Sequence, residues 1–579
     1  MTRRLTALLL CCTLWLGAFA ASVRSQLQDR LEYAQTVVKW WQDTPRKQAP
    51  LERLVTAIDE TSQLLASESA TDEEMQQALK TLNTRIAAVD KKIYCSTNAC
   101  GTDQQLQDNS SHWSYERSLQ SKHWILFWES GYGTAAPASV ATILKTADRI
   151  FEFYADSLKF ITINQGKSKT DTYKMIIRLR STDEWEASGS GIDNQIGLLT
   201  LSRWAYTSRD GQTVAHEIGH CFQYQVHCDN GNNNGWMYNW GRSTLNVFWE
   251  MCAQWQAYKF YPQMQFGNEW FNASINGQHR HPLCAQYRYE NFFIQDYFCQ
   301  RHGMDIIARL WNESQSPEDP LQAYMRLTMR GTTQNKLAQL GDEMWEYGAR
   351  MASFDMDHIR ARGKASIGKR AQTKLSKDAD GFWWPSKDNC IENWGNNVIR
   401  INNPGRATTI YAEFEGKVGA EGYVTYNKAR AGWRIGFVAL KRDGTRLYGD
   451  IERPSFKEPD KVIAFDCPAG CTYVWFVVSG APSYYWTHDW LSWSEEGQTE
   501  QWPYRVRFFQ TNVYGEKNVN DFPVGINDIA ESQRRVTKTN ADNSVYNLQG
   551  QRLGDAASLR TLSRGIYIVG GKKIIKTPL

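Results

Sequence analysis

The sequence predicts a multidomain α+β protein, and three observations lead to this prediction. At 579 residues the chain is long enough for roughly three to five domains of ordinary size. Helical periodicity dominates residues 26–94 and recurs within 101–365, whereas residues 380–513 carry short β-branched and aromatic runs separated by Gly, Pro and Asp. Hydrophobic residues at 42% and charged residues at 22% are ordinary for a globular chain and exclude wholesale disorder.

The N-terminus predicts export. Arg3 and Arg4 precede an apolar run over 5–17, and Ala18-Phe19-Ala20 follows, which together are typical of a secretory signal peptide over residues 1–20. The run is too short for a membrane anchor, and no other stretch has 18 consecutive apolar residues. We therefore expect a protein without a transmembrane segment that is secreted or held at the outer cell surface.

Residues 26–94 predict a helical bundle. The apolar positions of its last helix recur every three or four residues, and Thr71 with Glu74 forms a capping box in front of them. These positions are Met75, Leu79, Leu82, Ile86, Val89 and Ile93. We interpret the bundle as a spacer.

Residues 101–365 form the largest predicted domain, which mixes helices and strands. The pattern predicts a long helix over 137–160, strands over 174–179 and 196–204, a helix over 213–226 and further helices around Trp249 and Asn291. Residues 380–513 predict a β-sandwich, with strands beginning at Tyr423, Ile435 and Tyr473. Residues 514–543 read as a polar linker and 544–579 as a small β domain.

Charge and aromatic content limit the partners. Lys and Arg number 66 against 62 Asp and Glu, with no long basic run, so no electrostatic footprint for nucleic acid is present. Aromatic residues make up 13% of the chain, including 24 Trp, which suggests exposed stacking surfaces as well as core. The candidates for glycan contact through the predicted sandwich are Trp383, Trp384, Trp433, Trp486, Trp490 and Trp493.

Ten cysteines follow the predicted signal peptide, and an even number in an exported chain favours disulfides. Three pairs are close in sequence: Cys95 with Cys100, Cys221 with Cys228, and Cys467 with Cys471. The alternative is buried free thiols. Since no Cys-x-x-Cys occurs, a thiolate zinc site is not expected.

The candidate chemistry lies at His216-Glu217-Ile218-Gly219-His220. Residues four apart share one face of a helix, so both imidazoles can bind one metal ion, with Glu217 placed to take a proton from water. The alternative is a pair of surface histidines on an ordinary helix.

A catalytic zinc site needs a third protein ligand, for which the candidates are His227, Asp229 and Glu250. The metzincin pattern fails, because Gln223 and Val226 occupy the positions that would hold Gly and His. Glu250 is our choice, since a lone carboxylate in a mostly apolar helical stretch needs a partner such as a metal; a solvent-facing or salt-bridged glutamate is the alternative. Gln254, one turn later, could orient a ligand.

These motifs resemble the gluzincin metallopeptidases, which carry His-Glu-x-x-His on one helix and Glu on the next. The chain is closer still to an uncharacterised family of secreted bacterial and fungal proteins with a zincin-like domain. That resemblance covers about residues 110–350, through His123-Trp-Ile-Leu-Phe-Trp, Ala187-Ser-Gly-Ser-Gly, the His216 motif and Phe248-Trp-Glu-Met-Cys-Ala-Gln-Trp. It extends loosely to Val478-Ser-Gly-Ala-Pro, and a weaker similarity is to the enhancin-like, mucin-directed gluzincins.

The resemblance implies Zn²⁺ bound by His216, His220 and Glu250, with Glu217 as general base. The chain departs from thermolysin-like enzymes because no acidic residue follows Glu250 by one turn. The candidates for stabilising an oxyanion are His279, His281, Tyr287 and Tyr289.

The C-terminus is similar to the sorting tails of the type IX secretion system of Bacteroidetes. The matching segments are Gly525-Ile-Asn-Asp-Ile, Val545-Tyr-Asn-Leu-Gln-Gly-Gln-Arg-Leu and Arg564-Gly-Ile-Tyr-Ile-Val-Gly-Gly-Lys-Lys. The resemblance implies the type IX machinery as a partner; the alternative is a small β domain that merely ends the chain.

Two functional hypotheses follow from the sequence. One is a secreted zinc endopeptidase that acts on extracellular protein or glycoprotein, with the strand at 196–204 pairing with an extended substrate. The other is a non-catalytic surface glycan-binding protein with a vestigial zincin domain. Glu217 favours the enzyme, because a binding protein needs no carboxylate beside two metal-binding histidines.

Overall fold

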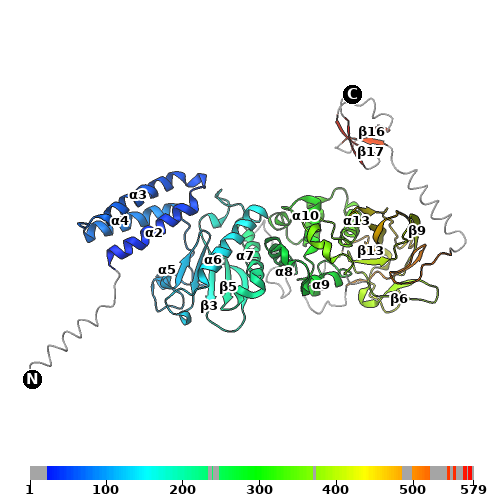
Figure 1. Cartoon of the computed structure of the whole chain (residues 1–579), viewed down its shortest axis with the longest axis horizontal. Coiled ribbons are helices and arrows are strands. Elements are labelled where there is room, and N and C mark those ends of the chain that lie inside the picture. The colour runs from blue at the N-terminus through cyan, green and yellow to red at the C-terminus, as the bar shows by residue number, and fades with distance from the viewer. Residues whose placement is uncertain are drawn as a thin grey trace, which may run out of the picture. The chain divides into compact units, whose positions relative to one another are not determined.

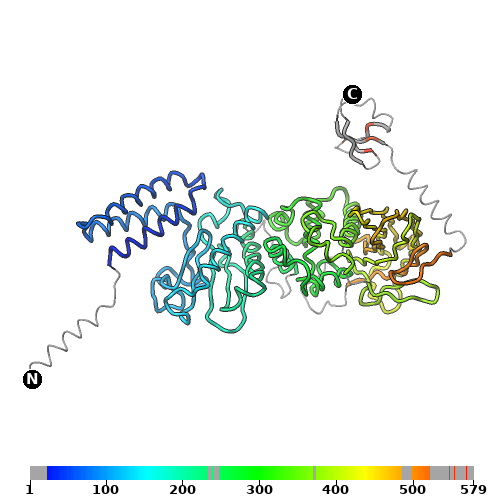
Figure 2. Tube along the Cα trace, viewed as in Figure 1, coloured from blue at the N-terminus to red at the C-terminus, as the bar shows by residue number. Residues whose placement is uncertain are grey.

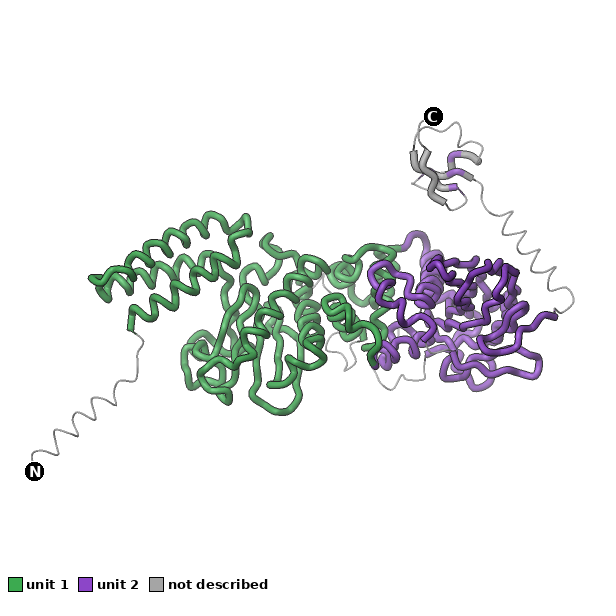
Figure 3. The backbone as a smooth tube through the Cα atoms, in the orientation of Figure 1, with its two compact units in different colours: residues 1–268, 288–328 green, residues 269–287, 329–579 purple. Residues whose placement is uncertain are grey.

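The computed structural model confirms a multidomain α+β protein. It describes residues 22–231, 238, 247–369, 373–485, 499–521, 544–547, 552–555, 565–569 and 572–576, so the predicted signal peptide lies outside the described residues. The chain falls into two compact units (Figure 3): unit 1 comprises residues 1–268 and 288–328, and unit 2 comprises 269–287 and 329–579. Among the described residues, no helix has the length and apolar character needed to cross a membrane.

Unit 1 begins with the predicted helical bundle (Figure 1), formed by α2 Val23–Trp41, α3 Gln48–Ala66 and α4 Asp72–Val89. The capping box forms as predicted: Thr71 Oγ1 accepts from the Glu74 amide, and the Glu74 carboxylate accepts from the Thr71 amide. The apolar faces of the three helices meet in one core that includes Leu27, Leu54 and Leu82.

A buried polar cluster joins this bundle to the following domain, so the spacer interpretation is wrong. Asp90, which ends α4, accepts hydrogen bonds from Tyr33 Oη (2.6 Å) and Trp41 Nε1 (3.3 Å) of α2. The same carboxylate forms an ion pair of 2.9 Å with Lys174 Nζ, and Lys174 immediately precedes a central strand. The bundle is thereby an integral part of unit 1.

A five-stranded mixed sheet forms the centre of unit 1. Its strands are β1 Ser118–Gln120, β2 Trp124–Trp128, β3 Met175–Arg180, β4 Ala187–Ile192 and β5 Ile196–Ser202. The order is β1-β2-β3-β5-β4; β2, β3 and β5 are parallel, and β1 and β4 run antiparallel to their neighbours. Because β5 pairs on both sides, the prediction that it offers a free edge to substrate is wrong, and β4 is the edge strand.

Helices pack against this sheet. The predicted long helix is α6 Val140–Glu152, continued by a π-helical turn over Phe153–Ser157. The His216 motif lies on α7 Gln212–Asn230, and Glu250 on α8 Val247–Phe260, as predicted. Unit 1 ends with α10 Phe293–His302, α11 Ile306–Asn312 and α12 Pro320–Thr328.

Strand β4 lies directly on the backbone of α7, which explains its glycines. A Cβ atom on Gly189 would be 1.8 Å from the carbonyl oxygen of Glu217, and one on Gly191 would be 1.8 Å from the ring of Tyr224. Since neither distance leaves room for a side chain, these two glycines set the separation of strand and helix.

Unit 2 contains two antiparallel sheets that share one hydrophobic core, a sandwich arrangement that Figure 2 shows in yellow to orange. One sheet has the order β11-β10-β13-β8, with β8 Asn396–Ile401, β10 Trp433–Lys441, β11 Arg446–Tyr448 and β13 Cys471–Gly480. The other has the order β12-β9-β14-β7-β6, with β6 Leu375–Lys377, β7 Trp383–Pro385, β9 Thr408–Gly416, β12 Asp460–Cys467 and β14 Tyr504–Phe509. The strand predicted at Tyr423 is wrong, because that segment is irregular.

Unit 2 also contains helices, among them the short α14 Arg360–Gly363. Helix α13 Thr333–Met351 packs Trp345 and Ala349 against Val438 and Val477 of the sandwich. Helix α9 Glu269–Asn276 also belongs to unit 2. At the C-terminus, β15 Ser544–Tyr546, β16 Arg552–Asp555, β17 Gly565–Val569 and β18 Lys572–Lys576 form a small antiparallel sheet in the order β16-β15-β17-β18. The predicted linker lies outside the described residues from position 522 onward.

Two of the three described tryptophans that we predicted as stacking surfaces are buried. Trp433 is fully buried and Trp383 is 8% exposed, both within the sandwich core. Trp384 is half-buried and donates to Asp378. The remaining three candidates, at 486, 490 and 493, lie outside the described residues.

All ten cysteines in the described part of the chain are free, so the disulfide prediction is wrong; eight of them are buried and Cys95 and Cys284 are half-buried. Cys221 and Cys228 lie on the same helix seven residues apart, about 10 Å along its axis, which exceeds the span of a disulfide. Cys467 and Cys471 come closest to each other, with their sulfurs 3.9 Å apart and unbonded.

A single methyl group added between β4 and α7 should destabilise unit 1. We expect Gly189→Ala to lower the free energy of unfolding by at least about 2 kcal/mol, because the new Cβ overlaps the helix backbone. Ser188→Ala, at the exposed neighbouring position, is the matched control and should change it by less than about 0.5 kcal/mol. Urea denaturation followed by circular dichroism measures both; equal stability of the two variants would contradict the close packing.

The buried carboxyl of Glu392 should make unit 2 more stable in mild acid. Burial raises the pKa of Glu392 from 4.5 to about 7, although its hydrogen bond from the His281 amide and the charge of Arg280 lower it in part. Protonation is therefore favoured by folding, so the stabilisation is complete below about pH 4.5 and is lost as the pH rises to about 7.

Glu392→Gln should remove this dependence. Between pH 8 and pH 5 we expect the wild type to gain about 2–3 kcal/mol relative to the Gln variant, measured as the difference in urea unfolding of the two proteins. Exposed Glu421→Gln serves as control. Parallel pH profiles of wild type and Glu392→Gln would refute the assignment.

Candidate metal centre

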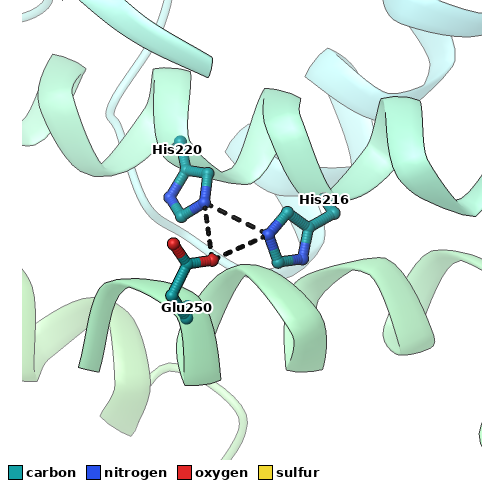
Figure 4. A group of neighbouring side chains, drawn as sticks. All are labelled: His216, His220 and Glu250. Carbon is teal, nitrogen blue, oxygen red and sulfur yellow. Dashed lines mark hydrogen bonds and ion pairs between the residues drawn. The ribbon is translucent and has the colours of Figure 1, made fainter. Parts of the chain in front are cut away.

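Helices α7 and α8 bring the three predicted metal ligands together (Figure 4). His216 Nε2 lies 3.1 Å and His220 Nε2 3.3 Å from Glu250 Oε2, and the two imidazole nitrogens are 3.2 Å apart. Both histidine side chains are buried and that of Glu250 is 22% exposed, so the group is accessible from one side. The choice of Glu250 as the third residue agrees with this arrangement.

The other two candidates for the third ligand have separate partners. Asp229 accepts hydrogen bonds from the Lys169 amide (2.9 Å) and from Gln225 Nε2 (2.8 Å). His227 packs its ring against Tyr224 near the C-terminal end of α7.

A close helix crossing positions Glu250. A Cβ on Gly219 would lie 3.1 Å from the Cα of Ala253 and 3.0 Å from Gln256 Oε1. Glycine at this position of the motif therefore lets α8 approach α7 almost backbone to backbone. Glu250 stands one turn before Ala253, and this approach brings its carboxylate to the two imidazoles.

The geometry of the three donor atoms fits zinc. Tetrahedral zinc with bonds of about 2.0–2.1 Å holds neighbouring ligand atoms about 3.3–3.4 Å apart. The three observed separations, 3.1, 3.2 and 3.3 Å, are close to this value. Two imidazoles and one carboxylate are also a ligand set of catalytic zinc sites, in which the fourth position is left for water or substrate.

Buried amides fix the orientation of both imidazoles. His216 Nδ1 lies 3.0 Å from Gln254 Oε1, and His220 Nδ1 lies 2.9 Å from Gln223 Oε1. Gln223 Nε2 donates to the carbonyl of Trp249 (3.0 Å), so its oxygen faces His220 as an acceptor. Each Nδ1 thus carries the hydrogen, and both Nε2 lone pairs face the carboxylate of Glu250.

Lone pairs that converge in this way require a positive charge between them. Burial disfavours the imidazolium of His220, but the charge and hydrogen bond of Glu250 outweigh burial and raise the pKa of His220 to about 9. For Glu250, burial would raise the pKa, but the neighbouring His220 and His216 hold it well below its ordinary value. The site is therefore built for a cation, which is a proton or a metal ion.

Glu217 is positioned by the edge strand of the sheet. Its Oε2 accepts a hydrogen bond of 2.7 Å from the amide of Gly189 on β4. The side chain is half-buried, and its charge acts on both His220 and Tyr289. The Glu217 carboxylate thus lies near the His216, His220 and Glu250 side chains and is also hydrogen-bonded to the edge strand β4.

Of the four predicted oxyanion donors, Tyr289 lies at the cluster. Its ring stacks on that of His216, with centroids 6.0 Å apart. Burial raises the pKa of Tyr289, and the charge of Glu250 and a hydrogen bond with Glu250 raise it further, so the hydroxyl stays protonated and can donate.

The other three predicted donors, Tyr287, His281 and His279, belong to unit 2. Tyr287 Oη donates to the carbonyl of Ser274. His281 Nδ1 accepts from the Leu283 amide (3.0 Å), and the carbonyl of His279 accepts from the Glu392 amide (2.8 Å).

A family model matches residues 85–515, which include α7, α8 and the sandwich. The chain belongs to this family, DUF6055, a family of unknown function. Comparison with curated proteins gives no match. The DUF6055 chain also aligns with two solved modules, a xylan-binding domain from CBM 22 and a family 22 carbohydrate-binding module of Clostridium thermocellum.

The alignments to both modules are weak. The alignment to the first module has 12% identity and a TM-score of 0.15, and covers 25% of this chain and 83% of the module. The alignment to the second module has 11% identity and a TM-score of 0.14, and covers 24% of this chain and 80% of the module. Neither likeness bears on the site of the DUF6055 chain.

Two features of the site were not predicted from the sequence. Gln223 faces His220 because it stands three residues later on the helix, a spacing that the sequence does show. Trp185 and Trp204 are 61% and 59% exposed and flank the β4–β5 pair at the end where β4 begins. No sequence signal separates these two from buried tryptophans, since exposure depends on the fold.

Gln254 should control zinc affinity through His216. Gln254→Met removes the acceptor for His216 Nδ1 and should weaken zinc binding about 10–100-fold. Gln254→Glu keeps an acceptor and is the matched control; its zinc affinity should equal or exceed that of the wild type. Competition with a chromogenic chelator measures all three proteins, and unchanged affinity of the Met variant would contradict the role.

Proposed function

We propose that this protein is a secreted, zinc-dependent endopeptidase of gluzincin type that acts on extracellular protein or glycoprotein. The single observation that carries the proposal is the convergence of His216, His220 and Glu250 at zinc-like separations beside the carboxylate of Glu217. A zincin-like domain with a parallel sheet, an antiparallel edge strand and two packed helices is consistent with it.

Each residue of the candidate site has a separate role in the proposed hydrolysis. His216, His220 and Glu250 would hold zinc, which when bound supplies Lewis acidity and lowers the pKa of its water to about 7. Glu217 accepts the proton of the attacking water and passes it to the departing amine. Tyr289 donates a hydrogen bond to the oxyanion, for which its raised pKa keeps the hydroxyl protonated.

Strand β4 is suited to bind an extended substrate. It is the edge of the sheet, and alternate backbone groups along it face away from β5. An extended peptide that adds to this edge by main-chain hydrogen bonds would pass Glu217, which already contacts the Gly189 amide. Trp185 and Trp204, at the start of the same edge, offer apolar surface to substrate side chains.

The N- and C-terminal segments support export. The predicted signal peptide and the resemblance of the tail to type IX sorting domains favour secretion or display at the outer cell surface. The small sheet β15 to β18 is consistent with a folded sorting domain.

Zinc content and proteolysis together test the proposal. We expect one zinc per chain by elemental mass spectrometry, lost in His220→Ala and in Glu250→Ala. Glu217→Gln should keep the zinc but lower the hydrolysis of casein and mucin at least about 100-fold, because the general base is removed. A wild type that takes up no zinc refutes the metal site, and equal activity of Glu217→Gln refutes the assigned base.

A further inference from the structure

Unit 2 contains a polar cavity that is separate from the metal site. Its volume is about 380 Å³, within the roughly 300–1,000 Å³ typical of pockets for small molecules. The walls come from the end of α9, the residues that follow it, the start of β8 and the loops at 373–374 and 389.

Main-chain contacts hold these walls in place. The amide of Asn396 donates to the carbonyl of Gln278 (2.7 Å), and that of Glu392 donates to the carbonyl of His279 (2.8 Å). Gly395 lies so close to this segment that a Cβ would be 2.0 Å from the His279 oxygen. The cavity is therefore preformed, which reduces the entropic cost of binding a ligand.

The lining is rich in carboxamides, which are Asn276, Gln278, Asn389, Asn396 and Asn397. A carboxamide both donates and accepts hydrogen bonds, as a sugar hydroxyl does. Lys374 at the exposed rim is the one lining residue with a formal charge at neutral pH, and no carboxylate lines the described part of the cavity. Such a lining suits an uncharged ligand with many hydroxyl groups better than a metal ion or an apolar molecule.

Asn396 supplies a second observation that points to a ligand. Its side chain is 2% exposed, and its Oδ1 has no hydrogen-bond partner among the described residues. An unpaired buried carbonyl oxygen costs about 1–3 kcal/mol, which a donor from a ligand would offset.

We propose that this cavity binds a neutral sugar unit of a glycan. The carboxamides of Asn276 and Gln278 hydrogen-bond the ring hydroxyls, and Asn396 Oδ1 accepts from one of them. Asn397 and Asn389 already have hydrogen-bond partners within the protein. The glycan contact of unit 2 is then this polar pocket, in place of the buried tryptophans of the sandwich. Sugar binding does not depend on the metal site, because no residue of that site lines the cavity.

Binding of free sugars to the purified full chain tests the proposal. Glucose, galactose, xylose, N-acetylglucosamine and N-acetylgalactosamine are each titrated while saturation transfer from protein to ligand is recorded by NMR. We expect at least one sugar to bind. Asn276→Ala, at the exposed rim, should weaken it at least tenfold, whereas Gln334→Ala, an exposed position on α13 away from the cavity, should not.

Asn396→Leu separates a ligand contact from a structural role. We expect this variant to lose binding at least tenfold while its melting temperature stays equal or rises, since an unpaired buried oxygen is removed. If the melting temperature of Asn396→Leu is instead lower than that of the wild type, the binding measured for Asn276→Ala alone decides the test. The proposal is overturned if no sugar binds, or if Asn276→Ala binds as the wild type does; zinc content is unaffected by either result.

Discussion

The approach of α8 to α7 at Gly219 is the constraint on which the candidate metal site depends. A catalytic zinc site takes three protein ligands, so the Glu250 carboxylate has to reach the same point as the two imidazoles. Because Gly219 allows a near-contact with Ala253, the carboxylate lies 3.1 Å from one imidazole and 3.3 Å from the other. Gly219 and Ala253, which are not candidate ligands, thus determine where the three candidate ligands meet.

The same α7 helix is constrained on its other side by β4. Gly189 contacts the backbone of Glu217, and the Gly189 amide holds the carboxylate of that residue. Strand β4, helix α7 and the candidate ligands are therefore connected through close backbone contacts and the hydrogen bond between the Gly189 amide and Glu217. Such backbone contacts hold the candidate site rigidly, which the proposed catalytic role would require.

Periodicity and the cost of burying charge made the grouping of His216, His220 and Glu250 predictable from the sequence. Spacing placed His216 and His220 on one face, and the unexplained carboxylate of an apolar helix indicated Glu250. The order of the strands could not be derived from the sequence, because either of two strands that are close in sequence can be the outer one. We expected the strand at 196–204 (β5) to pair with substrate at the edge of the sheet, but β4 is the edge strand. Burial of Trp383 and Trp433 was likewise a tertiary outcome, because core and surface tryptophans have the same sequence pattern.

Gln254 sets the orientation of His216 in the candidate site. An acceptor at His216 Nδ1 is needed to direct the Nε2 lone pair at the metal position, and an amide oxygen at 3.0 Å meets that need. A carboxylate there would add a negative charge; the amide adds none. Among the described residues of the cluster, Glu250 is the one anionic candidate ligand, so a divalent cation bound here would keep part of its positive charge.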